Sequence, residues 1–152
     1  MKIIDLFCGI GGLSLGFENA GFEVAAAIDM WDDAIKTYNH NRDEKVAMTI
    51  SVEDFNDSVL PEIIKKEKIT GIIGGPPCQG FSSANRHEKE KDDPRNKLFF
   101  EYLRFIRILH PKVFVIENVK EILTKDNGFA KNRIIEITEE LGYSVNVEVL
   151  NA

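Results

Sequence analysis

The sequence is poor in cysteine and histidine and contains no long hydrophobic run. Its 152 residues include two cysteines, Cys8 and Cys78, and three scattered histidines. Because the cysteines lack CxxC spacing, neither a disulfide framework nor a metal site is expected. No apolar run approaches the roughly 20 residues of a membrane span, and the Met-Lys start leads into a predicted strand rather than a signal peptide. We therefore expect a cytoplasmic protein with free thiols, no metal and no membrane partner.

Basic residues are also scarce relative to acidic ones. Lysine and arginine total 19 against 25 acidic residues, which gives a formal net charge of −6. A complete nucleic-acid-binding surface normally carries the opposite sign, at least locally. If the protein acts on nucleic acid, part of its binding surface is expected to lie outside this chain.

Apolar runs alternate with amphipathic segments along the whole chain. Strands are predicted over residues 2–7, 23–29, 46–50, 69–74, 113–117 and 143–150. Helices are predicted over residues 13–20, 32–41, 58–68, 97–109 and 130–141. This alternation predicts an α/β fold with a mostly parallel sheet and helices on both faces.

Ligands of such sheets bind beyond the carboxyl ends of the strands, and four distinctive features fall there. A glycine turn follows the first predicted strand, and Asp29 ends the second. Cys78 follows the fourth strand, and Glu117 ends the fifth. The pattern therefore predicts one functional site at this edge of the sheet.

The glycine turn lies in the segment DLFCGIGGLS. Gly9 and Gly11 match the first two glycines of a dinucleotide fingerprint, but Ser14 occupies the third, so NAD and FAD fit poorly. Asp29, 18 residues after Gly11, is placed to accept hydrogen bonds from both hydroxyls of a ribose. Turn and acid together predict an adenosyl ligand, S-adenosylmethionine. The alternative is a tight strand-to-helix turn that needs glycine for shape alone.

Cys78 lies between a diproline and a flexible segment in GGPPCQGFS, which is suitable for a nucleophile. Its alternative is a small buried packing residue, the role we expect for Cys8. Glu117 closes the apolar run VFVIE, where burial would be costly unless the carboxyl is paired or protonated. It can therefore serve as a donor to a heterocycle nitrogen, or it can simply cap the next helical turn. Trp31, near a helix start, could flank a ligand, but packing as a hydrophobic staple is the expected role.

The segments DLFCGIGGLSLGFENAGF, GGPPCQGFS and FVIENV, in this order and spacing, resemble the DNA cytosine-5 methyltransferases over essentially all 152 residues. The resemblance implies a Rossmann-like S-adenosylmethionine-dependent fold that is incomplete at the C-terminus. Residues 1–152 would be the N-terminal part of the catalytic domain, without the target-recognition domain. The Cys78 thiolate would add to C6 of a cytosine flipped out of duplex DNA, while Glu117 contacts N3 and the exocyclic amine. C5 would then take the methyl group.

The resemblance also implies a set of residues around the cofactor: Phe7, Gly9, Ile10, Gly11, Gly12, Asp29, Met30, Ile50, Gly75, Pro77 and Leu98. In this set Asp29 would bind the ribose, and Phe7, Met30 and Ile50 would contact the adenine. The backbone of the glycine turn would hold the methionine end.

A lid over the DNA is implied for the polar loop that reaches Asn96, with Gln79 and Ser82 as its DNA contacts. Two positions depart from the family pattern. Thr49 stands where an acid often contacts the adenine amine, and Met30 stands where tryptophan is frequent. Both changes are expected to weaken cofactor binding without abolishing it.

The chain ends at VEVLNA, just before the family's Gln-x-Arg-x-Arg segment. We therefore expect a fragment or a split subunit of a bacterial restriction–modification methyltransferase, with little activity alone. Its partners would be duplex DNA and a C-terminal remainder or complementary subunit that carries target recognition. Two alternatives remain: a tRNA cytosine-5 methyltransferase, or a silent S-adenosylmethionine-binding regulatory module.

Overall fold

The structure is a computed structural model that describes residues 1–55, 62, 68–77 and 94–151. The chain divides into two compact units. The first comprises Met1–Pro76 with Arg104–Glu117, and the second comprises Pro77–Leu103 with Asn118–Ala152. Each unit is described by itself.

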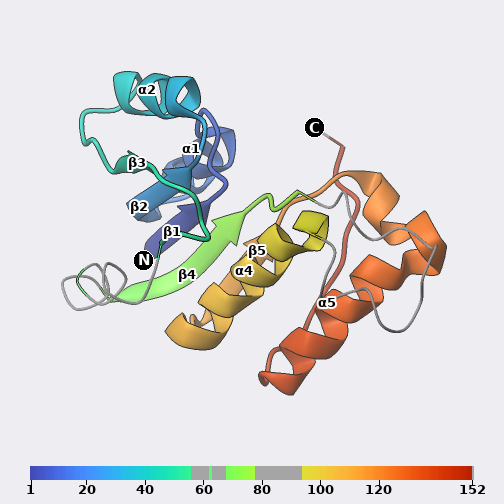
Figure 1. Ribbon diagram of the computed structural model, residues 1–152. Helices are drawn as coiled ribbons and strands as arrows, with labels where there is room; N and C mark the ends of the chain where they lie inside the picture. The colour runs from blue at the N-terminus through green and yellow to red at the C-terminus, as the bar shows by residue number, and fades with distance from the viewer. Residues whose placement is uncertain (56–61, 63–67, 78–93, 152) are drawn as a thin grey trace. The chain divides into compact units, whose positions relative to one another are not determined.

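The first unit is built on a five-stranded sheet in the order β3-β2-β1-β4-β5 (Figure 1). The strands are β1 (Lys2–Leu6), β2 (Glu23–Asp29), β3 (Ala47–Thr49), β4 (Ile69–Gly74) and β5 (Val113–Ile116), and all neighbouring pairs are parallel. The predicted α/β fold with a parallel sheet is confirmed. The sequence predicts the functional site at the carboxyl edge of this sheet.

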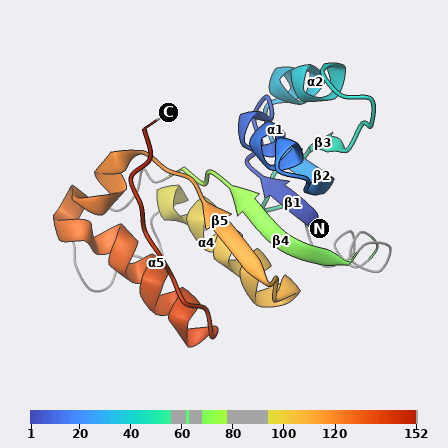
Figure 2. The ribbon, with the colours of Figure 1, turned by 180° about the vertical axis from the view of Figure 1, so that it is seen from behind.

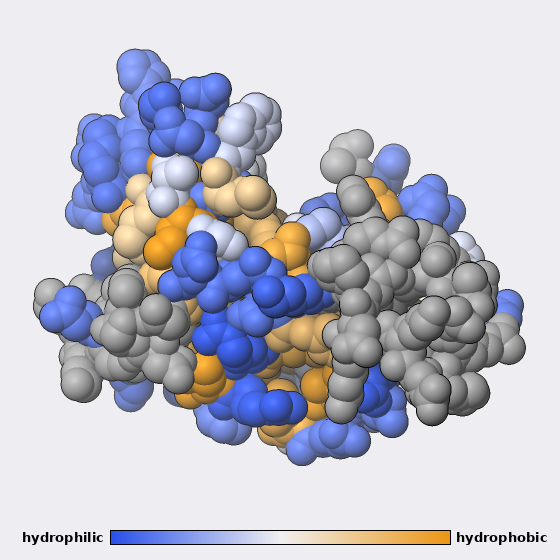
Figure 3. All heavy atoms as spheres, in the orientation of Figure 1, coloured by the Kyte–Doolittle hydropathy of each residue, from blue (hydrophilic) through white to orange (hydrophobic). Residues whose placement is uncertain are grey.

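Two helices follow the first two strands: α1 (Gly12–Asn19) and α2 (Asp32–His40). On α2, Ala34, Ile35 and Tyr38 are buried, while the outward face is hydrophilic, as Figure 3 shows. The buried face joins a core that includes Ile3 and Val24 of the sheet. This amphipathic pattern explains why the sequence predicted α2 almost to the residue.

The opposite face of the central strand is buried as well. Ile4 and Leu6 of β1 are fully buried, and Phe55 stacks on Phe105 of α4 (Pro94–Leu109) at a centroid separation of 5.6 Å. Arg104 of the same helix donates to the carbonyl of Phe55 at 3.0 Å. Burial on both faces is what continuous apolar strands predict.

The second unit contains the N-terminal part of α4 and three further elements, which Figure 2 shows from behind. These are the 3-10 helices η1 (Lys120–Leu123) and η2 (Lys125–Gly128), followed by α5 (Phe129–Glu140). Gly142 at φ 91° follows the C-terminal end of α5, as predicted.

The prediction of a strand over residues 143–150 is wrong. That segment has no regular secondary structure, and Val147, Val149 and Leu150 in it are exposed. A strand forms only against a neighbour, and apolar alternation alone does not supply one. Helix α4 begins three residues earlier than predicted, at Pro94, because proline suits the first helical position. The helix predicted over residues 58–68 falls almost entirely outside the described residues.

No described helix combines the length and the apolar character needed to cross a membrane.

Candidate active site at the carboxyl edge of the sheet

The turn after β1 has an unusual backbone. Phe7 lies at φ 61°, Gly9 at φ 51° and Gly11 at φ 89°, so alternate residues are left-handed. Glycine adopts this region freely, but a bulky side chain such as that of Phe7 does so at a cost of about 1–3 kcal/mol. The surrounding bonds hold the turn in place: Cys8 N donates to Ile28 O at 3.0 Å, and Gly11 N donates to Cys8 O at 2.9 Å. Strain of this kind is typical of functional loops.

Asp29, the last residue of β2, is tied into this turn. Its Oδ2 accepts from the amide of Gly9 and its Oδ1 accepts from the amide of Trp31, both at 2.9 Å. Each carboxylate oxygen has more than one lone pair, so both can still accept a hydrogen bond from a ligand hydroxyl. The side chain that the sequence assigns to a ribose is therefore held in a defined orientation beside the glycine turn.

The surroundings of Asp29 are open and apolar. The side chains of Ile10, Met30 and Trp31 are 60%, 73% and 63% exposed. Half-buried Ile50 adjoins them, because its amide donates to the carbonyl of Asp29 at 3.0 Å. Exposed apolar groups around a fixed acid suit a flat heterocycle attached to a ribose.

Trp31 corrects the sequence interpretation, because it is exposed and is not a buried hydrophobic staple. Its exposure favours the alternative that the sequence left open, a position beside a ligand, so Trp31 joins the candidate cofactor contacts. Its position next to the acid of a strand end was the signal available. Thr49, which departs from the family pattern, donates to Asp32 Oδ1 at 3.0 Å.

The glycine turn leaves room for a ligand at two positions. A methyl group built on Gly9 or Gly12 would meet no heavy atom within 4 Å. Gly12 also begins α1, whose Gly11 N-cap makes no side-chain capping bond. Backbone N–H groups at a helix start attract a carboxylate such as that of a methionine moiety.

Cys8 has the structural role expected of it. The side chain is buried, and burial raises the pKa of its thiol, with the carboxylates of Asp5 and Asp29 adding to the effect. A protonated, buried thiol is not a nucleophile. Cys8 is therefore unsuited to act as a nucleophile.

Glu117 follows β5 and lies beside the end of β4. Its amide donates to Gly74 O at 2.9 Å, and a methyl group built on Gly75 would come within 2.9 Å of Glu117 Oε2. The side chain of Glu117 is exposed, so the burial expected from the apolar strand before it is wrong. β5 ends at Ile116 and is itself only partly buried, so Glu117 follows a strand that gives it little cover.

The first unit therefore brings together most of the predicted site: Phe7, Gly9, Ile10, Gly11, Gly12, Asp29, Met30, Ile50, Gly75 and Glu117. Pro77 and Leu98, both half-buried, belong to the second unit. Cys78, Gln79 and Ser82 lie outside the described residues, so their roles stay predictions. Asn96, at which the polar loop of the proposed lid was expected to end, is part of α4.

Comparison with known proteins identifies this arrangement. The sequence matches the family described as C-5 cytosine-specific DNA methylase over residues 1–152. The chain belongs to this family. Among curated relatives, it is 41% identical to the type II methyltransferase M1.HphI of Haemophilus parahaemolyticus and 43% identical to M.FnuDI of Fusobacterium nucleatum, in both cases over 100% of its length.

The chain spans 41% and 42% of the length of these two relatives. Solved structures agree with the fold. One, described as a DNA modification methyltransferase encoded within an E. coli prophage, superposes with a TM-score of 0.75 at 35% identity, covering 92% of this chain and 38% of that one. DNMT2 of Spodoptera frugiperda, solved as a mutant, gives a TM-score of 0.67 at 28% identity, covering 91% and 40%. The methyltransferase fold expected from the resemblance is confirmed.

Membership of the family implies S-adenosylmethionine as methyl donor. The first unit fits such a group: the open positions at Gly9 and Gly12, the oriented Asp29 and the exposed Trp31 match its methionine, ribose and adenine parts. Within the described ranges, no cluster of three or more metal-ligating side chains occurs.

Proposed function

We propose that the full-length protein is a DNA cytosine-5 methyltransferase of a bacterial type II restriction–modification system and acts on duplex DNA in the cytoplasm. Residues 1–152 supply the N-terminal part of its catalytic domain, with the cofactor site and the nucleophile. The observation that carries this proposal is the meeting of the strained glycine turn, Asp29 and Glu117 at one edge of the sheet in a chain of this family.

S-adenosylmethionine supplies an electrophilic methyl group when it is bound. Asp29 accepts hydrogen bonds from the ribose hydroxyls through the oxygens that Gly9 and Trp31 already orient. Apolar contact with the adenine falls to Phe7, Met30, Trp31 and Ile50. The backbone from Gly9 to Gly12 holds the methionine end. Gly75, Pro77 and Leu98 are the further cofactor contacts that the family resemblance implies.

Cys78 and Glu117 act on the cytosine. The Cys78 thiolate forms a bond to C6, and the electron pair displaced from the C5–C6 double bond makes C5 nucleophilic. Glu117 binds N3 and the exocyclic amine, which stabilises the charge that develops on the ring. C5 would then take the methyl group while the bond from the methyl carbon to the cofactor's sulfur breaks and S-adenosylhomocysteine leaves. A base would take the C5 proton, and elimination would break the bond from C6 to the Cys78 sulfur and restore the thiolate.

The target base must leave the helix before Cys78 can reach C6. Gln79 and Ser82, on the loop that follows the nucleophile, contact the DNA. Recognition of the target sequence belongs to a C-terminal remainder or complementary subunit, which also supplies the positive charge that a chain of net charge −6 lacks.

The test is transfer of tritiated methyl groups by the full-length protein to duplex DNA and, in parallel, to tRNA. We expect label in the C5 position of cytosine in DNA, and none with Cys78→Ser. DNA that contains 5-fluorocytosine should trap the wild type as a covalent adduct, because fluorine cannot leave as a proton does. Label in tRNA alone would mean that the substrate is tRNA and not DNA. Cofactor binding without transfer or trapping would indicate a silent regulatory module.

A further inference from the structure

We infer that Arg42 is a positioning residue for the cofactor turn: Arg42, held by Glu18 and Tyr38, fixes the carbonyl of Gly11 and thereby sets the affinity for the cofactor. The last clause rests on the proposed function. The contacts themselves lie wholly within the first unit.

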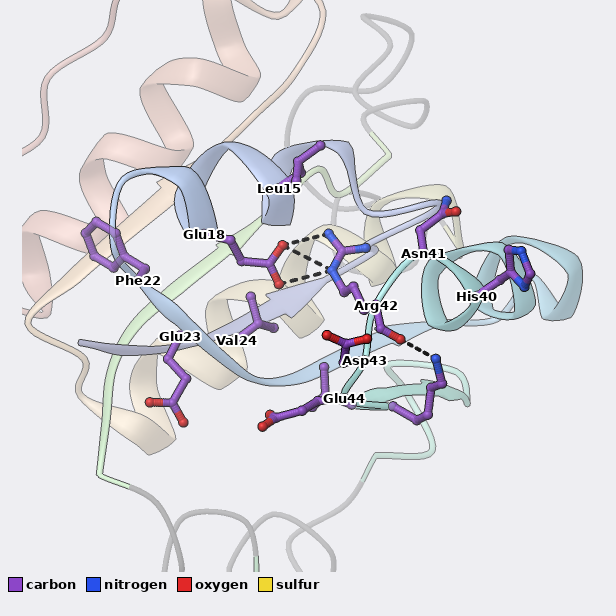
Figure 4. A pocket seen from close by; sticks show the side chains of 12 residues that line it. Leu15, Glu18, Phe22, Glu23, Val24, His40, Asn41, Arg42, Asp43 and Glu44 are labelled. Carbon is purple, nitrogen blue, oxygen red and sulfur yellow. Dashed lines mark hydrogen bonds and ion pairs between the residues drawn. The ribbon is translucent and has the colours of Figure 1, made fainter.

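Arg42 follows the C-terminal end of α2, far from the glycine turn in sequence, and its guanidinium reaches back to the start of α1. Nη2 donates to Gly11 O at 3.0 Å. Nε and Nη2 also donate to the carboxylate of Glu18 on α1, at distances of 2.9–3.1 Å (Figure 4). One planar group therefore joins α2, the glycine turn and the body of α1.

The position of the Gly11 carbonyl determines how the start of α1 is oriented. It accepts both from Arg42 and from the amide of Leu15, the first bond of α1. Both of its lone pairs are therefore engaged. Because Gly11 is the N-cap of α1, fixing its carbonyl also fixes the direction of the free N–H groups at the helix start, where a ligand carboxylate is expected.

Tyr38 holds the guanidinium from its other side. The guanidinium carbon of Arg42 lies 3.8 Å from the centre of the Tyr38 ring, a cation–π contact. A methyl group on Gly11 would collide with the Tyr38 ring at 2.6 Å and with Arg42 Nη1 at 2.7 Å. The left-handed turn is thus packed directly on these two side chains, and it has no room to shift toward them.

This geometry needs arginine. A planar fork can bind the Glu18 carboxylate, stack on a ring and donate to a carbonyl at once, whereas a lysine ammonium is a point donor. The Arg42 and Glu18 side chains are only 13% and 28% exposed, so the pair is protected from screening. They line an open hollow of about 670 Å³ (Figure 4), so water can reach Glu18 when Arg42 is removed, and the variant is expected to fold.

The test compares Arg42→Met and Arg42→Lys with Arg133→Met in the full-length protein. Arg133 is a matched control because it forms an ion pair with Glu136 on the exposed side of α5, in the second unit. The readouts are amide hydrogen exchange of residues 8–15 without cofactor, the Kd for S-adenosylmethionine by calorimetry, and the division between KM and kcat. Ile137→Ala, a core change on α5, controls for general loss of stability.

For Arg42→Met we expect exchange in residues 8–15 to rise about tenfold and the cofactor to bind about tenfold more weakly, the usual size of a lost charge-assisted hydrogen bond. The KM for the cofactor should rise together with its Kd. The kcat at saturating cofactor should stay within about twofold of the wild-type value, because Cys78 and Glu117 are untouched. Arg42→Lys should fall between, and Arg133→Met should keep wild-type values in this segment. Ile137→Ala shows the exchange pattern of a general loss of stability, in which residues 8–15 rise no more than the rest of the chain.

Equal exchange in residues 8–15 for Arg42→Met and Arg133→Met would overturn the inference. So would a uniform rise across the whole chain, which Ile137→Ala would reproduce. A wild type that binds no S-adenosylmethionine would reject the proposed function and the affinity clause with it. The exchange comparison would still decide whether Arg42 holds the turn.

Discussion

Glu117 Oε2 lies close to the space that a β-carbon on Gly75 would occupy. A methyl group at Gly75 would come within 2.9 Å of Glu117 Oε2, while the backbones are joined by the bond from Glu117 N to Gly74 O. The atom in the way is the end of a flexible side chain. Glycine at this position therefore controls where the Glu117 carboxylate points more than it controls the fold.

The first prediction concerns Gly75→Ala in the full-length protein. The Glu117 carboxylate must move, so we expect kcat for methyl transfer to fall at least about tenfold, as a misplaced catalytic group of this kind does. The free energy of unfolding should change by less than about 1 kcal/mol, because the displaced atom has free rotamers. Steady-state kinetics and urea unfolding measure both quantities.

Gly16→Ala is the matched control for that variant. A methyl group at Gly16, inside α1, meets no heavy atom within 4 Å. Alanine in a helix interior is favoured over glycine by about 0.8–1.0 kcal/mol, so stability should rise while kcat stays unchanged. If Gly75→Ala retains wild-type kcat, the proposed role of Glu117 at the cytosine loses its structural support.

The second prediction concerns Asp29→Asn. An asparagine has one carbonyl oxygen, so it cannot accept from both Gly9 and Trp31 as Asp29 does, and its amide group faces one of these donors. It also offers a weaker partner to ribose hydroxyls. We expect the Kd for S-adenosylmethionine to rise about tenfold to a hundredfold, the range for bonds to charged groups.

Asp33→Asn is the control for this change. Asp33 lies on the exposed face of α2, and within the described ranges its carboxylate pairs with Lys36 across one helical turn. Such surface pairs contribute little, so calorimetry should return the wild-type Kd. Equal affinities for the Asp29 and Asp33 variants would exclude Asp29 from the ribose site.

The sequence predicted the sheet well because its signals are local. β2 and β4 match their predicted bounds, and Gly21, at φ 86°, follows the C-terminal end of α1 as expected. The failures depend on contacts far along the chain. The apolar alternation after Gly142 resembles a strand, but pairing decides whether one forms, and local sequence does not encode the partner.

Some contacts of the candidate site could likewise be predicted from the sequence, and others could not. Gly9 and Asp29 could be paired from sequence, because a turn after one strand and an acid at the end of its neighbour share an edge. The Arg42 contact with Gly11 could not, since nothing near Arg42 indicates which carbonyl it will meet. The exposure of Trp31 was not predicted for a similar reason. Stapling is the usual role of a hydrophobic residue before a helix, and only the tertiary packing decides whether the side chain is buried.

The third prediction concerns the reactivity of Cys8. Burial raises the pKa of its thiol and keeps the thiolate population very small. Iodoacetamide at pH 8 should therefore leave Cys8 unmodified in the native protein and modify it only after unfolding, as measured by peptide mass mapping. Rapid alkylation of native Cys8 would show that the turn opens, contrary to the packing described here.

The fourth prediction concerns a buried acid under the glycine turn. Asp5 is fully buried, Ser14 Oγ donates to its Oδ2 at 2.5 Å, and Tyr38 donates to Ser14 Oγ at 2.9 Å. Its Oδ1 has no hydrogen-bond partner in the described part of the chain. Burial raises the pKa of Asp5 to about 7, against the opposing effects of the Ser14 bond and the Arg42 charge, with Asp29 adding to the rise.

A carboxyl with a raised pKa is stabilised in its protonated form by folding. The folded state binds more protons than the unfolded state between pH 4 and about 7, so the contribution of Asp5 to stability falls as pH rises through this window and levels off above it. At 1.36 kcal/mol per pKa unit the full change is roughly 4 kcal/mol.

Asp5→Asn removes this titration while keeping an oxygen for Ser14 to donate to. Urea unfolding of wild type and variant at pH 4, 5.5, 7 and 8 gives the difference in free energy of unfolding at each pH. The variant should gain stability relative to wild type by a few kcal/mol from pH 4 to pH 7 and no more by pH 8. Because other carboxylates titrate equally in both proteins, they cancel in this difference. A difference that is constant with pH would mean that folding leaves the pKa of Asp5 unshifted, and that Arg42 and Ser14 together offset its burial.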